Sequence, residues 1–169
     1  MSTADQFRSN PPHVAEERAM YQAWLDFHRG TLLWKCTGLT AAQLKSAAVS
    51  PSALTLLGLL RHMAEVERVW FRTRAAGLNL PDLYCSDDDE DGDFDNVADA
   101  DVTEAFATFK AECLAADEAV RTKSLDDTFV GRNGSISLRW VYVHMIEEYA
   151  RHNGHADLLR ELIDGATGD

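Results

Sequence analysis

The chain has 169 residues, of which 46% are hydrophobic, so it is long enough and apolar enough to fold around one sizeable core, and a disordered chain is excluded. There are 28 acidic and 16 basic residues, which give a formal net charge of −12. This charge argues against a nucleic-acid partner and against an anionic membrane surface, because both are bound mainly through Lys and Arg.

The first twelve residues, MSTADQFRSNPP, contain no basic segment followed by an apolar run, so we expect no signal peptide. No apolar run elsewhere approaches the length of a membrane span. The three cysteines, Cys36, Cys85 and Cys113, are widely spaced and form no CxxC motif, which favours reduced thiols. We therefore expect a cytoplasmic protein with one domain over residues 1–169.

The first expected helix covers residues 13–36. Its apolar face recurs at steps of four and three, as one face of a helix does, at Met20, Trp24, Phe27, Thr31 and Trp34. Gly38 follows as a C-terminal cap. The sequence TAAQL at 40–44 has the Thr-x-x-Gln form of a capping box and predicts a short helical turn.

A second helix is expected from Ser50 to Ala76. Ser50 can cap it, Pro51 suits its first turn, and Gly77 ends it. Its core face is predicted at Thr55, Leu59, His62, Val66 and Val69.

Residues 78–100 form a long acidic connection that includes the sequence DDDEDGDFD. A calcium-binding loop is the alternative, but no Asp-x-Asp-x-Asp-Gly series with a closing Glu can be drawn here. A solvated loop is the favoured interpretation, because like charges repel and Asp and Gly are poor helix formers. Phe94 is its one apolar anchor between 86 and 95, so we expect that stretch to be mobile and dispensable for metal binding.

The third helix is expected to begin near Asp101, with Asp101 as its cap and Glu104 as the capping partner. The dipeptide Asn133-Gly134 predicts a tight turn or small hairpin within residues 128–138. A fourth helix then covers residues 137–164. The predicted fold is all-α, a four-helix bundle with a long acidic loop between helices 2 and 3.

Polar residues interrupt the core face of the fourth helix. Steps of four and three give Val141, Met145, Glu148, His152, His155, Leu159 and Leu162. The second helix likewise carries His62 at the centre of its core face. An unpaired buried carboxylate is costly, and a divalent cation would satisfy these groups together.

His62, Glu148 and His152 are therefore the predicted metal ligands. Glu148 and His152 are four residues apart on one helix and can reach the same ion, while His62 comes from the facing helix. Three protein ligands leave a coordination position open, as in catalytic zinc sites, and the same set suits Fe(II). His144 and His155 are candidates for a supporting or pocket role; His155 could also be a fourth ligand.

Several other interpretations are weighed against this one. His62 alone would more often be a core histidine with a hydrogen-bond partner, and a single Glu-x-x-x-His pair is usually a surface pair. A ferritin-like di-iron site needs two Glu-x-x-His pairs, which this chain lacks. GxSxG, Walker and GxGxxG motifs are also absent. The tryptophans, Trp24, Trp34, Trp70 and Trp140, are expected to pack in the core, with pocket lining as the weaker option.

Two long segments carry a family resemblance. TLLGLLRHMAEVERVWF and WVYVHMIEEYARHNGHADLLRELIDG resemble the second and fourth helices of the DinB-like superfamily, and in particular its actinobacterial mycothiol-dependent S-transferases. FHRGTLLWKCTGLTAAQL resembles the same branch. The resemblance implies one divalent metal held by His62, Glu148 and His152. Many relatives have His at the position of Glu148, in an arrangement like that of the mycothiol-dependent maleylpyruvate isomerases, and many have Gln at that of His155.

The resemblance also implies a function. It predicts a divalent-metal-dependent enzyme that transfers a low-molecular-weight thiol such as mycothiol to a small electrophile. Zn is the first expectation for the metal, with Ni, Fe or Mn as alternatives, and the protein is expected to be a monomer or homodimer. The rival hypotheses are a metal-dependent hydrolase and a non-catalytic metal- or ligand-binding stress protein.

Overall fold

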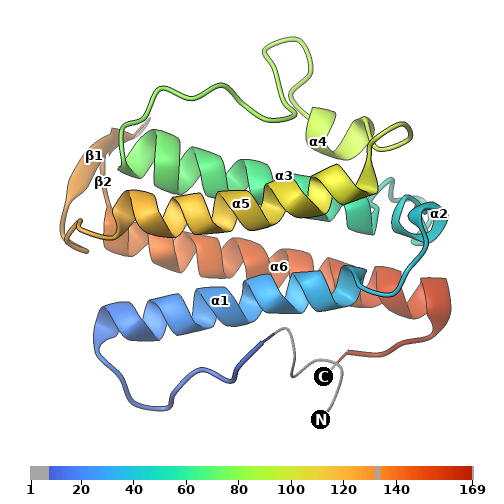
Figure 1. The fold of residues 1–169 in the computed structure, drawn as a ribbon, viewed down its shortest axis with the longest axis horizontal. Coiled ribbons are helices and arrows are strands. Elements are labelled where there is room, and N and C mark those ends of the chain that lie inside the picture. The colour runs from blue at the N-terminus through green and yellow to red at the C-terminus, as the bar shows by residue number, and fades with distance from the viewer. Residues whose placement is uncertain (1–7, 132–133, 169) are drawn as a thin grey trace.

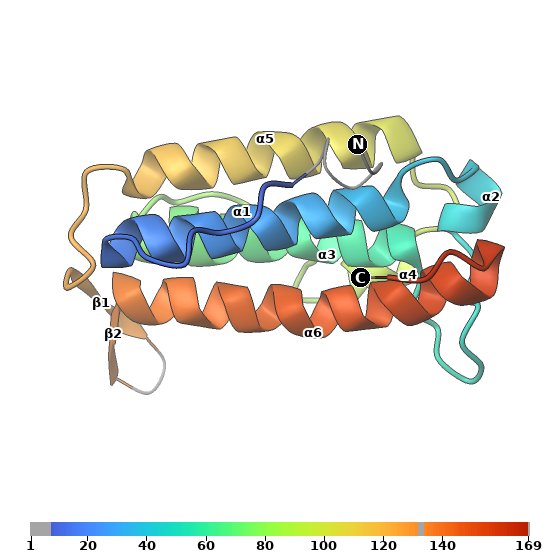
Figure 2. The same ribbon diagram turned by 90° about the horizontal axis from the view of Figure 1, so that it is seen from below.

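The computed structural model describes residues 8–131 and 134–168, and four long helical rods dominate it (Figures 1 and 2). These rods are α1 (Glu17–Cys36), α3 (Leu56–Glu67) continued by the π-helix η2 (Arg68–Ala75), α5 (Val102–Val120) and α6 (Leu138–Asp164). The shorter elements are α2 (Ala41–Leu44), α4 (Gly92–Asp95) and the antiparallel strands β1 (Thr128–Gly131) and β2 (Gly134–Ser137). The all-α four-helix bundle predicted from the sequence is confirmed. Within the described residues, no helix is both long and apolar enough to cross a membrane.

The order of the helices explains the long acidic connection. Helices α1 and α6 run in one direction, and α3 and α5 run in the opposite direction (Figure 1). Because α3 and α5 are consecutive long helices that run in parallel, the chain must travel back along the bundle between them. Residues 76–101 make that crossing over α3 and include the short helix α4.

Two predicted helix starts are wrong. The first helix begins at Glu17 rather than residue 13, and the second begins at Leu56 rather than near Ser50. The Thr55 hydroxyl caps α3 by accepting a hydrogen bond from the Gly58 backbone N–H at 2.9 Å, so Thr55 precedes the helix instead of forming part of it. Pro51 lies in the preceding turn, after a cis peptide bond.

The predicted caps at Thr40 and Asp101 are confirmed, although Glu104 contributes to the Asp101 cap only through its backbone N–H. Thr40 and Gln43 form the capping box of α2, and the Asp101 carboxylate accepts hydrogen bonds from two backbone N–H groups of α5. The predicted hairpin is present, with Gly131 paired to Gly134. Asn133, on which the turn prediction partly rests, lies outside the described residues.

The predicted core face of α6 drifts out of the core. Val141, Met145 and Leu159 are buried, but Leu162 is 62% exposed. A strict seven-residue pattern drifts about 20° per heptad on a straight α-helix, so after three heptads the predicted stripe has left the buried face. The core prediction is also wrong for Trp24 and Trp140, which are 42% and 45% exposed.

A buried ion pair that the sequence pattern does not predict joins three of the long helices. Arg29 on α1 donates two hydrogen bonds of 2.7 Å to the Glu67 carboxylate on α3, and Tyr149 on α6 donates a third of 2.7 Å to the same group. Glu67 is fully buried. A buried carboxylate is tolerated when its oxygens are hydrogen-bonded and its charge is paired, and both conditions hold for Glu67.

Candidate metal site

Three side chains from two neighbouring helices converge beside the core. His62 comes from α3, and Glu148 and His152 come from α6, with one ligand atom of each within 4.8 Å of the others. His152 Nε2 lies 3.4 Å from Glu148 Oε2, and the rings of His62 and His152 have centroids 4.7 Å apart. The fold therefore brings together the three residues predicted as ligands, and this group could hold a metal ion.

The donor set and its exposure fit a divalent ion with an open position. Two imidazole nitrogens and one carboxylate are ligands that zinc and Fe(II) both accept. The side chains of His62, Glu148 and His152 are 21%, 17% and 11% exposed. The group is thus close to the surface, so a small molecule could reach an ion held there.

Asp93, which the sequence analysis did not single out, supports His62. Its Oδ2 lies 2.7 Å from His62 Nδ1, and the residue is only 3% exposed. A carboxylate can only accept, so Nδ1 carries the proton and donates it. His62 Nε2 is then left with the lone pair that a metal needs, which is the usual way in which an outer carboxylate orients a ligating histidine.

The Phe94 ring holds the same loop against the site. It stacks on His62 with ring centroids 4.6 Å apart. Gly58 on α3 permits this approach, because a Cβ there would lie 3.2 Å from the Phe94 ring and 3.1 Å from the Thr55 hydroxyl. Asp93 and Phe94 therefore contact a candidate ligand from within residues 86–95, the stretch expected to be dispensable for metal binding, and that expectation stays a prediction to be tested. The only sequence signal for these contacts was a phenylalanine within an acidic run.

Further anchors come from α3 itself. The Arg61 guanidinium donates to the backbone carbonyls of Asn96 at 2.6 Å and Gly92 at 2.9 Å. Glu65 Oε2 accepts from the backbone N–H groups of Leu83 and Tyr84, both at 2.8 Å. These contacts lie on either side of His62 along α3 and attach the two ends of the acidic stretch to the helix that carries the ligand.

Burial lowers the pKa of two histidines at the site, His152 and His144. Burial, together with the nearby His62 and His155, lowers the pKa of His152 to about 4. Burial also lowers the pKa of His144. Both rings are therefore neutral at neutral pH, as a metal ligand must be.

His155 and His144 lie on two sides of the candidate ligands. His155 Nδ1 is 3.4 Å from His152 Nδ1, so it can hydrogen-bond that ring. His144 Nε2 is 3.7 Å from Glu148 Oε1. His144, Glu147 and Glu148 form a second cluster of possible metal ligands. This cluster is the weaker ligand set, because Glu147 is 48% exposed and paired with Arg151.

The three cysteines are free thiols poorly suited to nucleophilic chemistry. Burial raises the pKa of Cys36 to about 12 and that of Cys85 to about 11, and it raises the pKa of Cys113 well above the ordinary value. Since the thiolate is the nucleophile, none of these side chains is activated at neutral pH.

Comparison with known proteins places the fold and the family. The family model described as Mycothiol-S-transferase matches residues 20–165. A solved structure, a conserved protein of locus from Enterococcus faecalis, superposes with a TM-score of 0.68 at 15% identity and covers 90% of this chain and 100% of its own. At that identity the likeness concerns the fold alone. No curated protein shows significant similarity to the chain.

Proposed function

Because the chain belongs to the mycothiol S-transferase family of DinB-like proteins, we propose that it transfers a low-molecular-weight thiol, mycothiol or a close analogue, to a small electrophile. The ligands of the required divalent ion are His62, Glu148 and His152. The observation that carries the proposal is that these three groups converge from two helices while remaining partly open to solvent.

The chain's own residues have distinct roles in this proposal. His152 is a neutral ligand because its pKa is lowered, and Asp93 accepts from His62 Nδ1 and so turns His62 Nε2 toward the other two ligands. Glu148 contributes a single negative charge, so the loaded site keeps a net positive charge that favours an incoming anion. When bound, the ion lowers the pKa of a coordinating thiol and so supplies the thiolate at neutral pH.

The chemistry of the cysteines supports an external thiol. Burial raises the pKa of all three protein thiols, so the nucleophile is better supplied by a cosubstrate than by the chain. The proton released from that thiol needs an acceptor. We assign that role to His144, whose Nε2 lies 3.7 Å from Glu148 Oε1 and whose lowered pKa leaves it neutral.

A metal-dependent hydrolase is the second candidate, and it is favoured by the presence of a neutral histidine, His144, near Glu148. In that reaction a water replaces the thiol, and His144 is the general base. The two functions differ in whether turnover requires a thiol.

The test begins with metal content. Protein purified without an affinity tag and dialysed should carry one divalent ion per chain, and His62→Ala should carry none, because two ligands from one helix remain. His13→Ala, at an exposed histidine far from the group in sequence, is the matched control and should keep its ion. Full occupancy in His62→Ala would overturn the ligand assignment.

The second part of the test is a transfer assay with a generic electrophile. Mycothiol, bacillithiol, glutathione and no thiol are compared, each with and without chelator. We expect turnover that requires both a thiol and the metal. Turnover that is lost with chelator but independent of thiol would assign the hydrolase function, and no turnover despite a loaded site would leave a binding role.

A further inference from the structure

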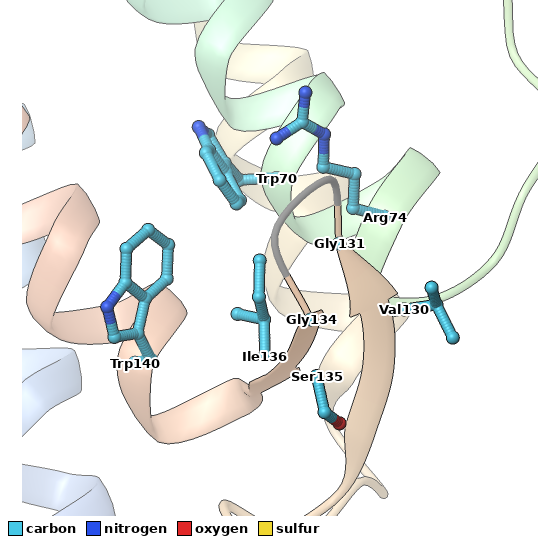
Figure 3. Close-up of a pocket in the computed structure, with 8 residues that line it drawn as sticks. All are labelled: Trp70, Arg74, Val130, Gly131, Gly134, Ser135, Ile136 and Trp140. Carbon is cyan, nitrogen blue, oxygen red and sulfur yellow. The ribbon is translucent and has the colours of Figure 1, made fainter.

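A cavity of about 640 Å³ lies between η2, the β-hairpin and the first turn of α6 (Figure 3). It contains none of the three candidate ligands. The side chains of Trp70, Arg74, Ile136 and Trp140 face its interior, whereas Val130 and Ser135 are paired on the other face of the hairpin (Figure 3).

Two indoles form one wall of this cavity. The ring centroids of Trp70 on η2 and Trp140 on α6 are 5.2 Å apart, and Trp140 is 45% exposed. A half-exposed indole contributes little to the core, and large aromatic surfaces left at a concave site are typical of ligand pockets. The π-helix that carries Trp70 also supports a functional role for this cavity, since π-helical segments occur frequently at functional sites.

Arg74 provides the charge of the cavity. Its guanidinium carbon lies 4.3 Å from the centre of the Trp70 ring, and it is the only charged residue among those that line the cavity in the described chain. Arg68 and Arg72 on the same helix each bind Glu112 at 2.6 Å, whereas within the described residues no ion pair engages Arg74. Although the chain has a net charge of −12, no carboxylate of residues 8–131 or 134–168 forms an ion pair with this arginine, which lies over an aromatic wall.

One imidazole ring links the cavity to the candidate metal site. His144 contacts Trp70 and Trp140, with ring centroids 4.6 Å and 4.7 Å apart, and its Nε2 lies 3.7 Å from Glu148 Oε1. The cavity and the candidate ligands therefore lie on two sides of the His144 ring, so a ligand in the cavity would displace none of them.

We propose that this cavity binds the electrophilic substrate as a planar organic anion, with its ring against Trp70 and Trp140 and its carboxylate on Arg74. Indole faces favour flat rings, and an arginine already stacked on an indole can pair with a carboxylate. The role of the ligand as electrophile rests on the proposed function. The thiol sulfur needs the open position at Glu148 and the two histidines, so the cavity beyond His144 is assigned to the second substrate.

The test measures binding to metal-free protein by quenching of tryptophan fluorescence. The probes are naphthalene-2-carboxylate and its uncharged analogue, naphthalene-2-carboxamide. We expect the carboxylate to bind roughly tenfold more tightly, the size of one charge-assisted contact. Arg74→Gln should remove that preference and leave the affinity for the carboxamide unchanged, whereas Arg74→Lys should keep part of it.

Two further variants make the result specific. Arg121→Gln is the matched control, because Arg121 is a 66% exposed arginine at the C-terminus of α5 that does not line the cavity. This variant should keep the full preference. Trp140→Ala should weaken both probes together, with its fold checked by thermal melting. Equal binding of the two probes to the wild-type protein, or a preference that survives Arg74→Gln, would overturn the proposal.

A competition experiment separates the two substrates. Mycothiol should not displace the carboxylate probe from metal-free protein, and displacement would assign the cavity to the thiol instead. Because these measurements use neither metal nor turnover, a failed transfer assay would leave the binding result intact. Conversely, loss of probe binding would leave the metal and thiol requirements untouched.

Discussion

His62 on α3 and Asp93 in the acidic crossing are joined by a 2.7 Å hydrogen bond, although they lie 31 residues apart. The contact makes the loop part of the candidate metal site. It fixes the tautomer of His62 and therefore decides which ring nitrogen faces Glu148 and His152.

Replacement of Asp93 tests that contact. Asp93→Asn keeps the size of the side chain but removes its charge, so it should weaken metal binding about 10- to 100-fold, the usual cost of losing an outer carboxylate. Competition with a chelating dye measures the change. Asp95→Asn, two residues further along at an exposed position, is the control and should bind metal like the wild type. Equal effects of the two substitutions would remove Asp93 from the site.

Replacement of Glu148 tests the charge of the ligand set. Glu148→Gln preserves the shape of the side chain and removes its negative charge, so it should weaken metal retention and change the pH at which a bound thiol becomes reactive. Glu148→His, which replaces the carboxylate with a third imidazole ligand, should preserve metal binding. Metal content after dialysis and the pH profile of thiol transfer measure both effects. If Glu148→Gln retained metal with an unchanged profile, Glu148 would not be a ligand.

The metal-free protein should lose stability in mild acid because of His152. Its pKa is about 4 when folded and about 6.5 when unfolded, so between these values the unfolded chain binds a proton that the folded chain does not. The contribution of His152 to stability is therefore complete above pH 6.5 and falls as the pH drops toward 4. Between pH 7.5 and 5 the loss is on the order of 2 kcal/mol.

Urea unfolding of chelator-treated protein at these two pH values measures the loss. Other groups titrate over the same range, so the informative quantity is the difference between the wild type and His152→Gln. We expect the variant to show the smaller loss. Identical pH dependence in the two proteins would contradict the lowered pKa.

The buried ion pair should contribute more to stability than any surface pair. Glu67→Gln leaves the Arg29 charge buried without its main partner and should lower the free energy of unfolding by about 3–5 kcal/mol. Asp26 and Asp117, which also pair with Arg29, should reduce this loss. Glu118→Gln, which breaks an exposed pair with Arg121, should cost far less, because solvent screens that pair. Urea unfolding of both variants compares them, and similar costs would show that Glu67 is not a structural anchor.

The repeating pattern of apolar residues was enough to predict the bundle. Helix periodicity is a local property, so the positions of α1, α3, α5 and α6 could be recognised before any contact was known. The same pattern placed His62, Glu148 and His152 on facing core stripes, and two packed helices then had to bring them together. Ends governed by side-chain caps were predictable where the capping residue was unambiguous, as at Asp101, and not where Ser50 and Thr55 competed.

Only the tertiary structure decided the contacts between segments that lie far apart in the sequence and share no helical repeat. The Asp93 contact depends on a crossing whose path is set by Arg61, Glu65 and the space above Gly58. The pairing of Arg29 with Glu67 depends on which faces of α1 and α3 meet. In the same way, the cavity at Trp70 and Trp140 exists because the hairpin stands beside η2. A hydrogen bond or a cavity wall depends on distances of a few ångströms between remote residues, and local sequence preferences carry no information about those distances.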